Sequence, residues 1–140
     1  MDYSRIALAA LGGTVAYFVL GFLFFALLPL RKEFEKYPAV YRTQADMKGV
    51  MPLGMFAMLL AIAVLAVLYA MLYRGGSGLM EGARFGMLVG RYAVGSFVLH
   101  NHVNLNIGAK LTVQQAVAYF VEWTVVGIVI GLIYRGAALI

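Results

Sequence analysis

The sequence has no cysteine and few charged residues. Without cysteine, the chain has no disulfide, no thiolate nucleophile and no cysteine metal site. Charged residues make up 12% of the 140 residues, about half of what a soluble domain of this size usually carries. Hydrophobic residues make up 64%, and the mean hydropathy is +0.89. The composition excludes an ordinary soluble domain and indicates an integral membrane protein.

Four apolar segments are each long enough to cross a bilayer, which needs about 20 residues. They cover residues 6–30, 50–73, 82–105 and 113–134. Together they occupy most of the chain, so we expect a single all-α integral membrane domain over residues 1–140, a four-transmembrane-helix bundle. Because the last two connections are short, we expect the second and third helices to pack together, as do the third and fourth.

The positive charge does not indicate a nucleic-acid partner. The net charge is +5, but the basic residues flank apolar segments, as is typical of a membrane protein facing anionic lipid. The membrane side that holds connection 31–49 carries more of them, which predicts that this side is cytoplasmic and that both termini lie outside. In this connection Phe34, Tyr37 and Tyr41 lie among charges, and Pro38 breaks any continuous helix. Two interpretations stay open: an interfacial segment with its aromatic side toward lipid, or a solvated loop.

Local signals mark several helix ends. In the turn after the second segment, Gly75 suits a helix C-cap and Ser77 an N-cap. Thr112 and Gln115 have the spacing of a capping box, which predicts that the fourth helix begins there. Pro52 is expected in the first turn of the second helix, where proline is tolerated.

Glu122 lies near the middle of the last apolar segment. A buried carboxylate without a partner is costly, so it must be neutral, hydrated or paired. At about 1.5 Å per residue, Arg91 in the preceding segment lies at a similar depth. We therefore predict an intramembrane pair between Arg91 and Glu122, which either fixes the helix register or lies beside a hydrated pathway or polar ligand site. Tyr119, one helical turn from Glu122, could donate a hydrogen bond to it.

A second group of polar side chains includes His100, His102 and Asn104. Residues two apart on a helix point about 200° apart, so both imidazoles cannot close on one metal ion. With no cysteine and few acids as additional ligands, we predict no metal site. One interpretation is that these groups hydrogen-bond backbone and water at a helix end. The others are a proton relay or a single-histidine ligand for a haem or pigment.

Small residues recur at helical spacing in three of the apolar segments. Such stripes let another helix backbone approach closely. The positions predicted for helix packing are Gly82, Gly86 and Gly90 in the third segment and Gly127 and Gly131 in the fourth. The first segment has Gly13, Tyr17 and Gly21 at the same spacing, which also indicates packing. Polar groups on two faces of the third segment predict that this helix is central in the bundle or in an oligomer.

Three stretches carry a resemblance to known proteins. They are the Gly-rich opening segment that ends at Leu30, Tyr-Arg-Gly-Gly-Ser at 73–77, and Val-Gly-Ile-Val-Ile-Gly-Leu-Ile-Tyr-Arg at 126–135. On the basis of these stretches, the whole chain resembles small, uncharacterised four-helix bacterial membrane proteins of unknown function. The resemblance implies a multi-pass helical fold in a bacterial membrane, with the inner (cytoplasmic) membrane as the expected location, and it carries over no catalytic residues.

The sequence contains no nucleophile–base set, no paired carboxylates and no known metal spacing, so we expect no enzyme and no cofactor other than lipid. Our first interpretation is a non-catalytic accessory or structural subunit, because Gly-rich faces imply a partner in a homo-oligomer or in a larger membrane complex. The alternative is a homo-oligomeric transporter or channel that uses Arg91 and Glu122. A second alternative is a single-histidine haem, pigment or quinone binder.

Overall fold

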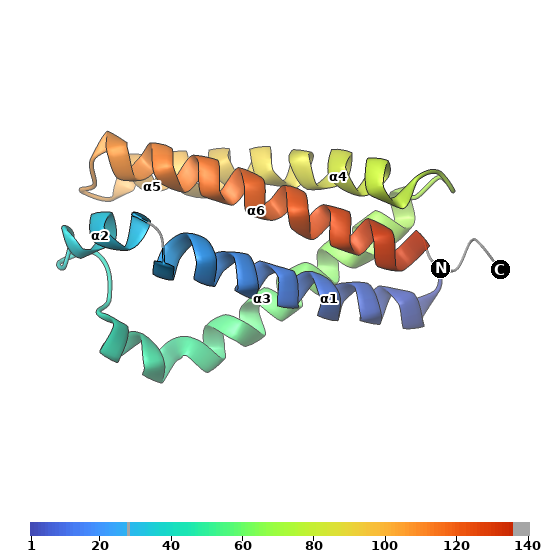
Figure 1. Cartoon of the computed structure of the whole chain (residues 1–140), viewed down its shortest axis with the longest axis horizontal. Helices are drawn as coiled ribbons and strands as arrows, with labels where there is room; N and C mark the ends of the chain where they lie inside the picture. Colours follow the sequence, from blue (N-terminus) through green and yellow to red (C-terminus); the bar gives the residue numbers. More distant parts are fainter. Residues whose placement is uncertain (28, 136–140) are drawn as a thin grey trace.

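The computed structural model describes residues 1–27 and 29–135, and every regular element in this part of the chain is a helix. In chain order these are α1 (Tyr3–Gly21), the π-helix η1 (Phe22–Leu27), α2 (Leu30–Glu35), α3 (Gln44–Leu72), α4 (Gly78–Ala93), the π-helix η2 (Val94–Leu99), α5 (His100–Asn104) and α6 (Ala109–Arg135). The helices run roughly side by side, with α3 crossing the others at an angle (Figure 1). Residue 28, within the first predicted segment, lies outside the described residues.

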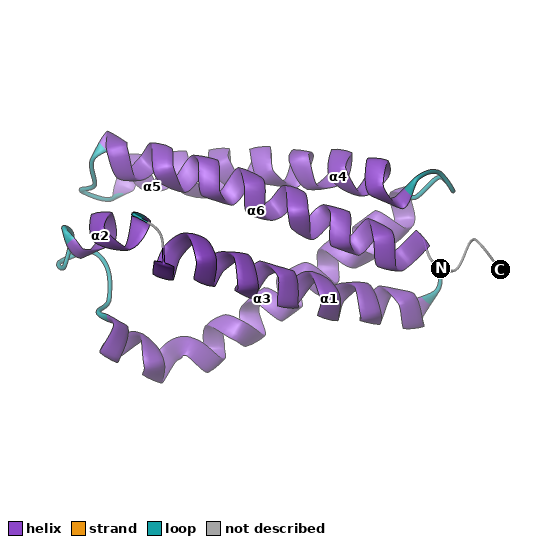
Figure 2. Ribbon diagram, viewed as in Figure 1, coloured by secondary structure: helices purple, strands orange, loops and turns teal. Residues whose placement is uncertain are grey.

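Three helices are long and apolar enough to cross a membrane: Tyr3–Ala26, Gln44–Leu72 and Ala109–Arg135, with mean hydropathies of 2.1, 2.7 and 2.1. The predicted segment 82–105 corresponds to α4, η2 and α5, which follow one another without a break in the helical chain (Figure 2). This stretch is less apolar than the other three, because it carries Glu81, Arg84 and Arg91 and ends in the polar run His100–Asn104. The helical fold class is thus confirmed, and three candidate spans are present among the described residues.

Capping residues set the helix starts, and they differ in places from the prediction. Ser77 caps α4 as predicted, since its hydroxyl accepts a hydrogen bond from the Met80 backbone N–H. Thr43 caps α3 through the Asp46 backbone N–H, so Pro52 lies inside this helix and not in its first turn. The helix α6 begins at Ala109, so the predicted capping box at Thr112 is wrong.

The long helix α6 lies at the centre of the structure. It packs against α4 on one side and against α1 on another, and α3 packs mainly against α1. Figure 1 shows the same order, with the first half of α3 diverging from the other helices. Near the α3–α4 turn, the rings of Tyr69 and Phe85 meet with centroids 5.4 Å apart. The prediction that the second and third helices pack together is therefore right only at this end. The prediction that the third helix is central is wrong for the bundle of one chain, because α6 takes that place; the alternative, a central position in an oligomer, stays a prediction.

Backbone contact joins α4 to α6. A Cβ atom added at Gly82 would lie 2.5 Å from the Gly127 carbonyl oxygen, and one added at Gly86 would lie 2.5 Å from the Trp123 carbonyl oxygen. Gly90 faces Phe120 in the same way, at 3.2 Å. Only glycine permits helices to approach this closely. The glycine spacing on both helices thus determines how α4 is rotated against α6.

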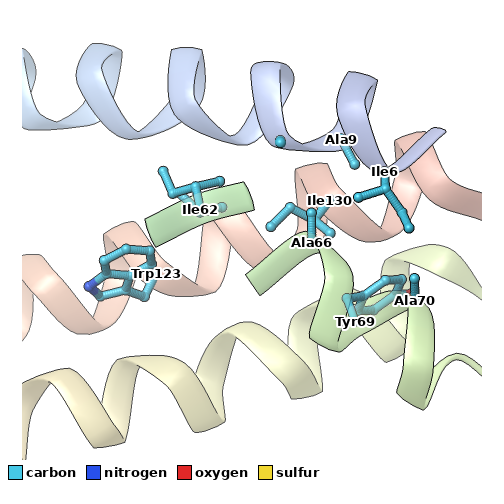
Figure 3. Close-up of a cluster of buried hydrophobic side chains, with 10 residues drawn as sticks. Ile6, Ala9, Ile62, Ala66, Tyr69, Ala70, Trp123 and Ile130 are labelled. Carbon is cyan, nitrogen blue, oxygen red and sulfur yellow. The ribbon is translucent and has the colours of Figure 1, made fainter. Parts of the chain in front are cut away.

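Side chains fill the space between α1, α3 and α6. Figure 3 shows Ile62 and Ala66 of α3 between α1 and α6, with Ile130 of α6 beside them. Ile62 is fully buried and touches the position where a Cβ of Gly13 would stand. These contacts involve the second half of α3, whereas residues 44–57 are all exposed. Only one half of α3 is therefore held by the bundle.

A second cluster closes the end of the bundle that contains α2. The half-buried rings of Phe34, Tyr37 and Tyr41 pack on the buried Leu111 of α6 and its neighbours. The aromatic side of the connection 31–49 thus faces the protein interior, so both interpretations drawn from the sequence, aromatic side toward lipid and solvated loop, are wrong for these rings. Their burial against α6 removes more apolar surface than exposure at an interface would.

Candidate functional site

The central feature of the structure is the carboxyl group of Glu122 on α6. The side chain is 0% exposed, and neither carboxyl oxygen has a hydrogen-bond partner among the described residues. It faces α1, because a Cβ atom added at Gly21 would lie 3.3 Å from Glu122 Oε1. The glycine therefore leaves the space that the carboxyl group occupies. A buried acid in this setting requires a proton, water or a cation to offset the loss of hydration.

Aromatic side chains lie close to this carboxyl group on both of the helices that meet there. Tyr17 is one helical turn before Gly21 on α1, and Tyr119 is one turn before Glu122 on α6. The Tyr17 ring packs on Trp123 with centroids 5.2 Å apart, and the Tyr119 ring packs on Phe25 at the same separation. The structure thus places the predicted residue Tyr119 beside Glu122, although no hydrogen bond joins them in the part of the chain that is described.

The predicted pair between Arg91 and Glu122 is wrong. Arg91 is exposed and lines a shallow surface groove with Val117 and Val121 of α6, which lie on a different face of the helix from Glu122. The glycine contact explains this arrangement: Gly90 packs against α6, so the next residue is rotated about 100° from that contact and lies at the side of α6 that carries Val117 and Val121. The prediction compared only the depths of Arg91 and Glu122 along their helices. It did not include the direction in which each side chain leaves its helix axis.

A larger groove opens on the other side of α4 and η2. Its volume is about 620 Å³, and it lies between the diverging α3 and the helices α1, α4, η2 and α6. The aromatic side chains along it are Tyr17, Tyr92, Phe97, Tyr119 and Trp123. Three of them, Tyr17, Tyr119 and Trp123, are also the aromatic neighbours of Glu122 or adjacent to it in the chain. The groove and the buried acid therefore share one aromatic wall, and Glu122 itself does not line the groove.

Both π-helices adjoin this site. η1 begins at Phe22, directly after Gly21, and η2 contributes Ser96 and Phe97 to the groove. A π-helical turn widens the helix and is frequently found at functional sites. No sequence signal pointed to either of them.

The polar group at the end of the third segment lies apart from Glu122. His102 Nδ1 lies 2.7 Å from the Thr112 hydroxyl, which also donates to the Gly108 carbonyl oxygen at 3.3 Å. Thr112 is ten residues before Glu122 on α6, about 15 Å along the helix axis. His100 and Asn104 are exposed. Among the described residues, no group of three or more His, Asp or Glu side chains gathers that could hold a metal ion.

An ion cluster that the sequence did not reveal joins α2 to the start of α6. Glu33 is buried, and its Oε1 atom forms ion pairs with Lys36 Nζ at 2.7 Å and with Lys110 Nζ at 2.9 Å. The hydrogen bonds from Lys36 and Lys110 hold the pKa of Glu33 below its ordinary value. The Tyr37 hydroxyl accepts a hydrogen bond from the Gly108 backbone N–H at 2.9 Å. The i,i+3 spacing of Glu33 and Lys36 was visible in the sequence, but the contact with Lys110 depends on the fold.

Two other buried polar atoms also lack a partner among the described residues, the Tyr69 hydroxyl and Gln114 Oε1. Neither group ionises readily, so Glu122 is the buried group with the strongest need for a ligand. No known protein family, no curated protein and no solved structure matches this chain. The geometry around Glu122 is therefore the basis for any functional proposal.

Proposed function

We propose that the chain is a four-span integral membrane protein of the bacterial inner membrane, and that it carries protons across the bilayer by way of Glu122. The single observation behind this proposal is the complete burial of a carboxyl group that has no partner among the described residues. An ionisable group inside a membrane is expensive and marks an ion or proton pathway by default when nothing pairs with it. The α4–η2–α5 stretch supplies the fourth span in this proposal.

The packing of the glycines favours transport over the accessory role. The accessory role was inferred from Gly-rich faces that would need an outside partner. Gly82, Gly86 and Gly127 instead contact one another inside the chain. They need no second protein, so the argument for a purely structural subunit loses its main support.

A second candidate function keeps the accessory role through a different surface. Residues 44–57 of α3 are all exposed, and Gly49 and Gly54 have no other atom within 4 Å of an added Cβ. An apolar helix half that the chain itself does not cover can pack against a second copy or a larger complex. A mass measurement of the protein purified in mild detergent tests this candidate, since a monomer contradicts it.

Proton flux into liposomes tests the transport proposal. The purified protein is placed in vesicles that contain a trapped pH-sensitive dye, and an inward proton gradient is imposed with the membrane potential clamped. We expect faster acidification than in empty vesicles, and loss of the difference in Glu122→Gln, which keeps the shape of the side chain but cannot ionise.

Arg91→Gln is the matched control for this experiment. It also removes one charge from a predicted span, but from an exposed position that does not face Glu122. We expect its flux to equal that of the wild type. Equal flux in the wild type and Glu122→Gln, or in the wild type and empty vesicles, would contradict the proposal.

A further inference from the structure

The groove beside Glu122 has the features of a binding site for an organic ligand. Its volume of about 620 Å³ lies within the usual range of small-molecule pockets, about 300–1,000 Å³. Apolar and aromatic side chains form nearly all of its lining, and Ser96, Tyr17, Tyr92 and Tyr119 supply hydroxyl groups. Its exposed lining side chains include Leu60 and Val64 of α3 and Tyr92 of α4, so it opens between these two helices, toward the lipid in a membrane-spanning protein. A ligand that enters there must be soluble in the bilayer.

No Lys, Arg, Asp or Glu lines the groove. Glu122 does not line it either, but Trp123, the next residue in the chain, and Tyr119, one turn earlier on α6, both do. In a low dielectric a carboxylate attracts a cation over several ångströms, because water does not screen it. The faces of aromatic rings attract cations as well, and cages of such rings recognise quaternary ammonium groups.

We propose that this groove binds a hydrophobic monovalent organic cation, whose charge is balanced by the Glu122 carboxylate across the aromatic wall formed by Tyr17, Tyr119 and Trp123. The proposal deepens the proposed function, since it rests on the same carboxyl group and names the substrate class. The titratable side chains next to Glu122 are Tyr17 of α1, one turn before Gly21, and Tyr119 of α6, one turn before Glu122. From α4 the groove receives Tyr92, which is 74% exposed, and from α3 and η2 it receives no charged side chain.

Binding of the cation is coupled to release of a proton. In the empty site the carboxyl group of Glu122 holds its proton, because nothing else among the described residues offsets its charge. When a cation enters the groove, the O–H bond of the carboxyl group breaks and the proton passes to water. The net charge of the site is unchanged, and no oxidation or reduction takes place. Exchange of one proton for one cation follows from this balance.

A pair of probes with the same shape and opposite charge tests the proposal. Tetraphenylphosphonium is a hydrophobic cation, and tetraphenylborate is its anionic counterpart. Trp123 is the single tryptophan of the chain and lines the groove, so its fluorescence reports directly on occupancy. We expect tetraphenylphosphonium to change this fluorescence to saturation, and tetraphenylborate to bind at least about tenfold more weakly.

Titration calorimetry on the detergent-solubilised protein, in two buffers of different ionisation enthalpy, counts the protons released. We expect up to one proton per bound tetraphenylphosphonium in the wild type and none in Glu122→Gln, with an affinity about tenfold lower. Tyr17→Leu, which removes one aromatic wall, should weaken binding while the proton release remains. Circular dichroism verifies that each variant is folded, and the comparison of the two probes on the wild type requires no variant.

Equal affinity for the two probes would overturn the proposal, as would full tetraphenylphosphonium affinity in a folded Glu122→Gln. If calorimetry shows that tetraphenylphosphonium binds while the fluorescence of Trp123 does not change, the ligand binds elsewhere, and the proposal is overturned as well. The proposed function fails separately. If proton flux depends on Glu122 but the cation does not bind, only the substrate class is wrong. If the cation binds and releases a proton, but no proton flux occurs either without the cation or with a gradient of tetraphenylphosphonium, the site is right and the transport role is wrong.

Discussion

The two sides of α6 are packed in different ways. On the α4 side, glycines on both helices bring the backbones together, and Gly86 stands where even one added carbon would meet the Trp123 carbonyl oxygen. On the α1 side, larger side chains separate the helices, and the carboxyl group of Glu122 lies among them. Backbone contact leaves no room for a ligand. The looser side holds the buried acid and adjoins the groove, so the same helix provides a rigid face and a face suited to binding.

The helix α3 extends this contrast. It has no glycine stripe that matches α1, and its contacts with the bundle depend on Ile62, Ala66 and Tyr69 in its second half. We expect Ile62→Ala to have the largest effect on stability, a loss of about 2–5 kcal/mol, because it removes a fully buried side chain from this narrow contact. Unfolding in mixed micelles measures the loss. Val64→Ala, at a position that is 53% exposed, is the control and should change little.

The glycine contact can be broken by one carbon atom. In Gly86→Ala the new Cβ would lie 2.5 Å from the Trp123 carbonyl oxygen, so the helices must move apart. We expect a loss of about 1–3 kcal/mol in the same unfolding assay.

Gly54→Ala in α3 is the matched control for this substitution, since nothing lies within 4 Å of its Cβ position. At an open helical position alanine stabilises by about 0.5–1 kcal/mol relative to glycine. A stability loss in Gly86→Ala together with a gain in Gly54→Ala would support the contrast between the tightly packed α4 and the loosely packed α3. A Gly86→Ala protein as stable as the wild type would contradict it.

The end of the bundle beside α2 offers a smaller test. Tyr37→Phe removes the hydroxyl that accepts from the Gly108 backbone N–H at 2.9 Å. We expect a loss of about 1 kcal/mol, the usual net worth of one hydrogen bond. The same substitution at Tyr3, which is 75% exposed, should leave the free energy of unfolding unchanged.

The Glu33 cluster should give the molecule a dependence on acidity. Lys36 and Lys110 donate hydrogen bonds to Glu33 and lower its pKa. The ionised carboxylate therefore stabilises the folded state at pH values above 4.5, the ordinary pKa of a glutamate. This stabilisation is lost as the pH falls through the lowered folded-state pKa. Both ammonium groups are more than half exposed, so water screens them and the effect at neutral pH is modest.

Hydrogen exchange of the α2 amides, followed as the pH falls from 6 to 3, measures this effect (the pH range brackets an ordinary carboxyl pKa of about 4). The measured quantity is the protection factor, which is the exchange rate of an unfolded chain at the same pH divided by the observed rate. We expect the protection of the α2 amides to fall at the acid end in the wild type and to be low at every pH in Glu33→Gln. Glu35→Gln is the matched control on the same helix, because its pair with Arg31 is exposed on both sides. Identical acid profiles for the two variants would show that burial of Glu33 plays no part.

The smallest effect is expected at Arg91. Because its guanidinium is exposed and does not meet Glu122, Arg91→Gln should change the free energy of unfolding by less than about 0.5 kcal/mol. A double-mutant cycle with Glu122→Gln should give no coupling energy. A coupling above about 1 kcal/mol would restore the ion pair that the sequence predicted.

The sequence was sufficient for the helical class and for several local features. Hydrophobic run lengths placed the long helices, and Ser77 marked the start of α4 correctly. The position of Glu122 in the middle of an apolar segment also marked this residue as unusual. These features depend on neighbouring residues in the chain, so short-range physical rules apply to them.

The rest depended on how the helices turn about their own axes. Gly82 and Gly86 suggested close packing, but their partners Trp123 and Gly127 were known only once α6 was placed between α4 and α1. That rotation separates Arg91 from Glu122 and directs the acid toward Gly21. The stripe of Gly13, Tyr17 and Gly21 was visible at helical spacing, but nothing in the sequence distinguished the wall of a site from an ordinary packing face.

The central position of α6 has a consequence for how the protein is made. The ribosome makes α1, α3 and α4 before α6, yet α1 and α4 each pack chiefly against α6. Most of the contacts that hold these two helices in place can therefore form only after α6 has been synthesised.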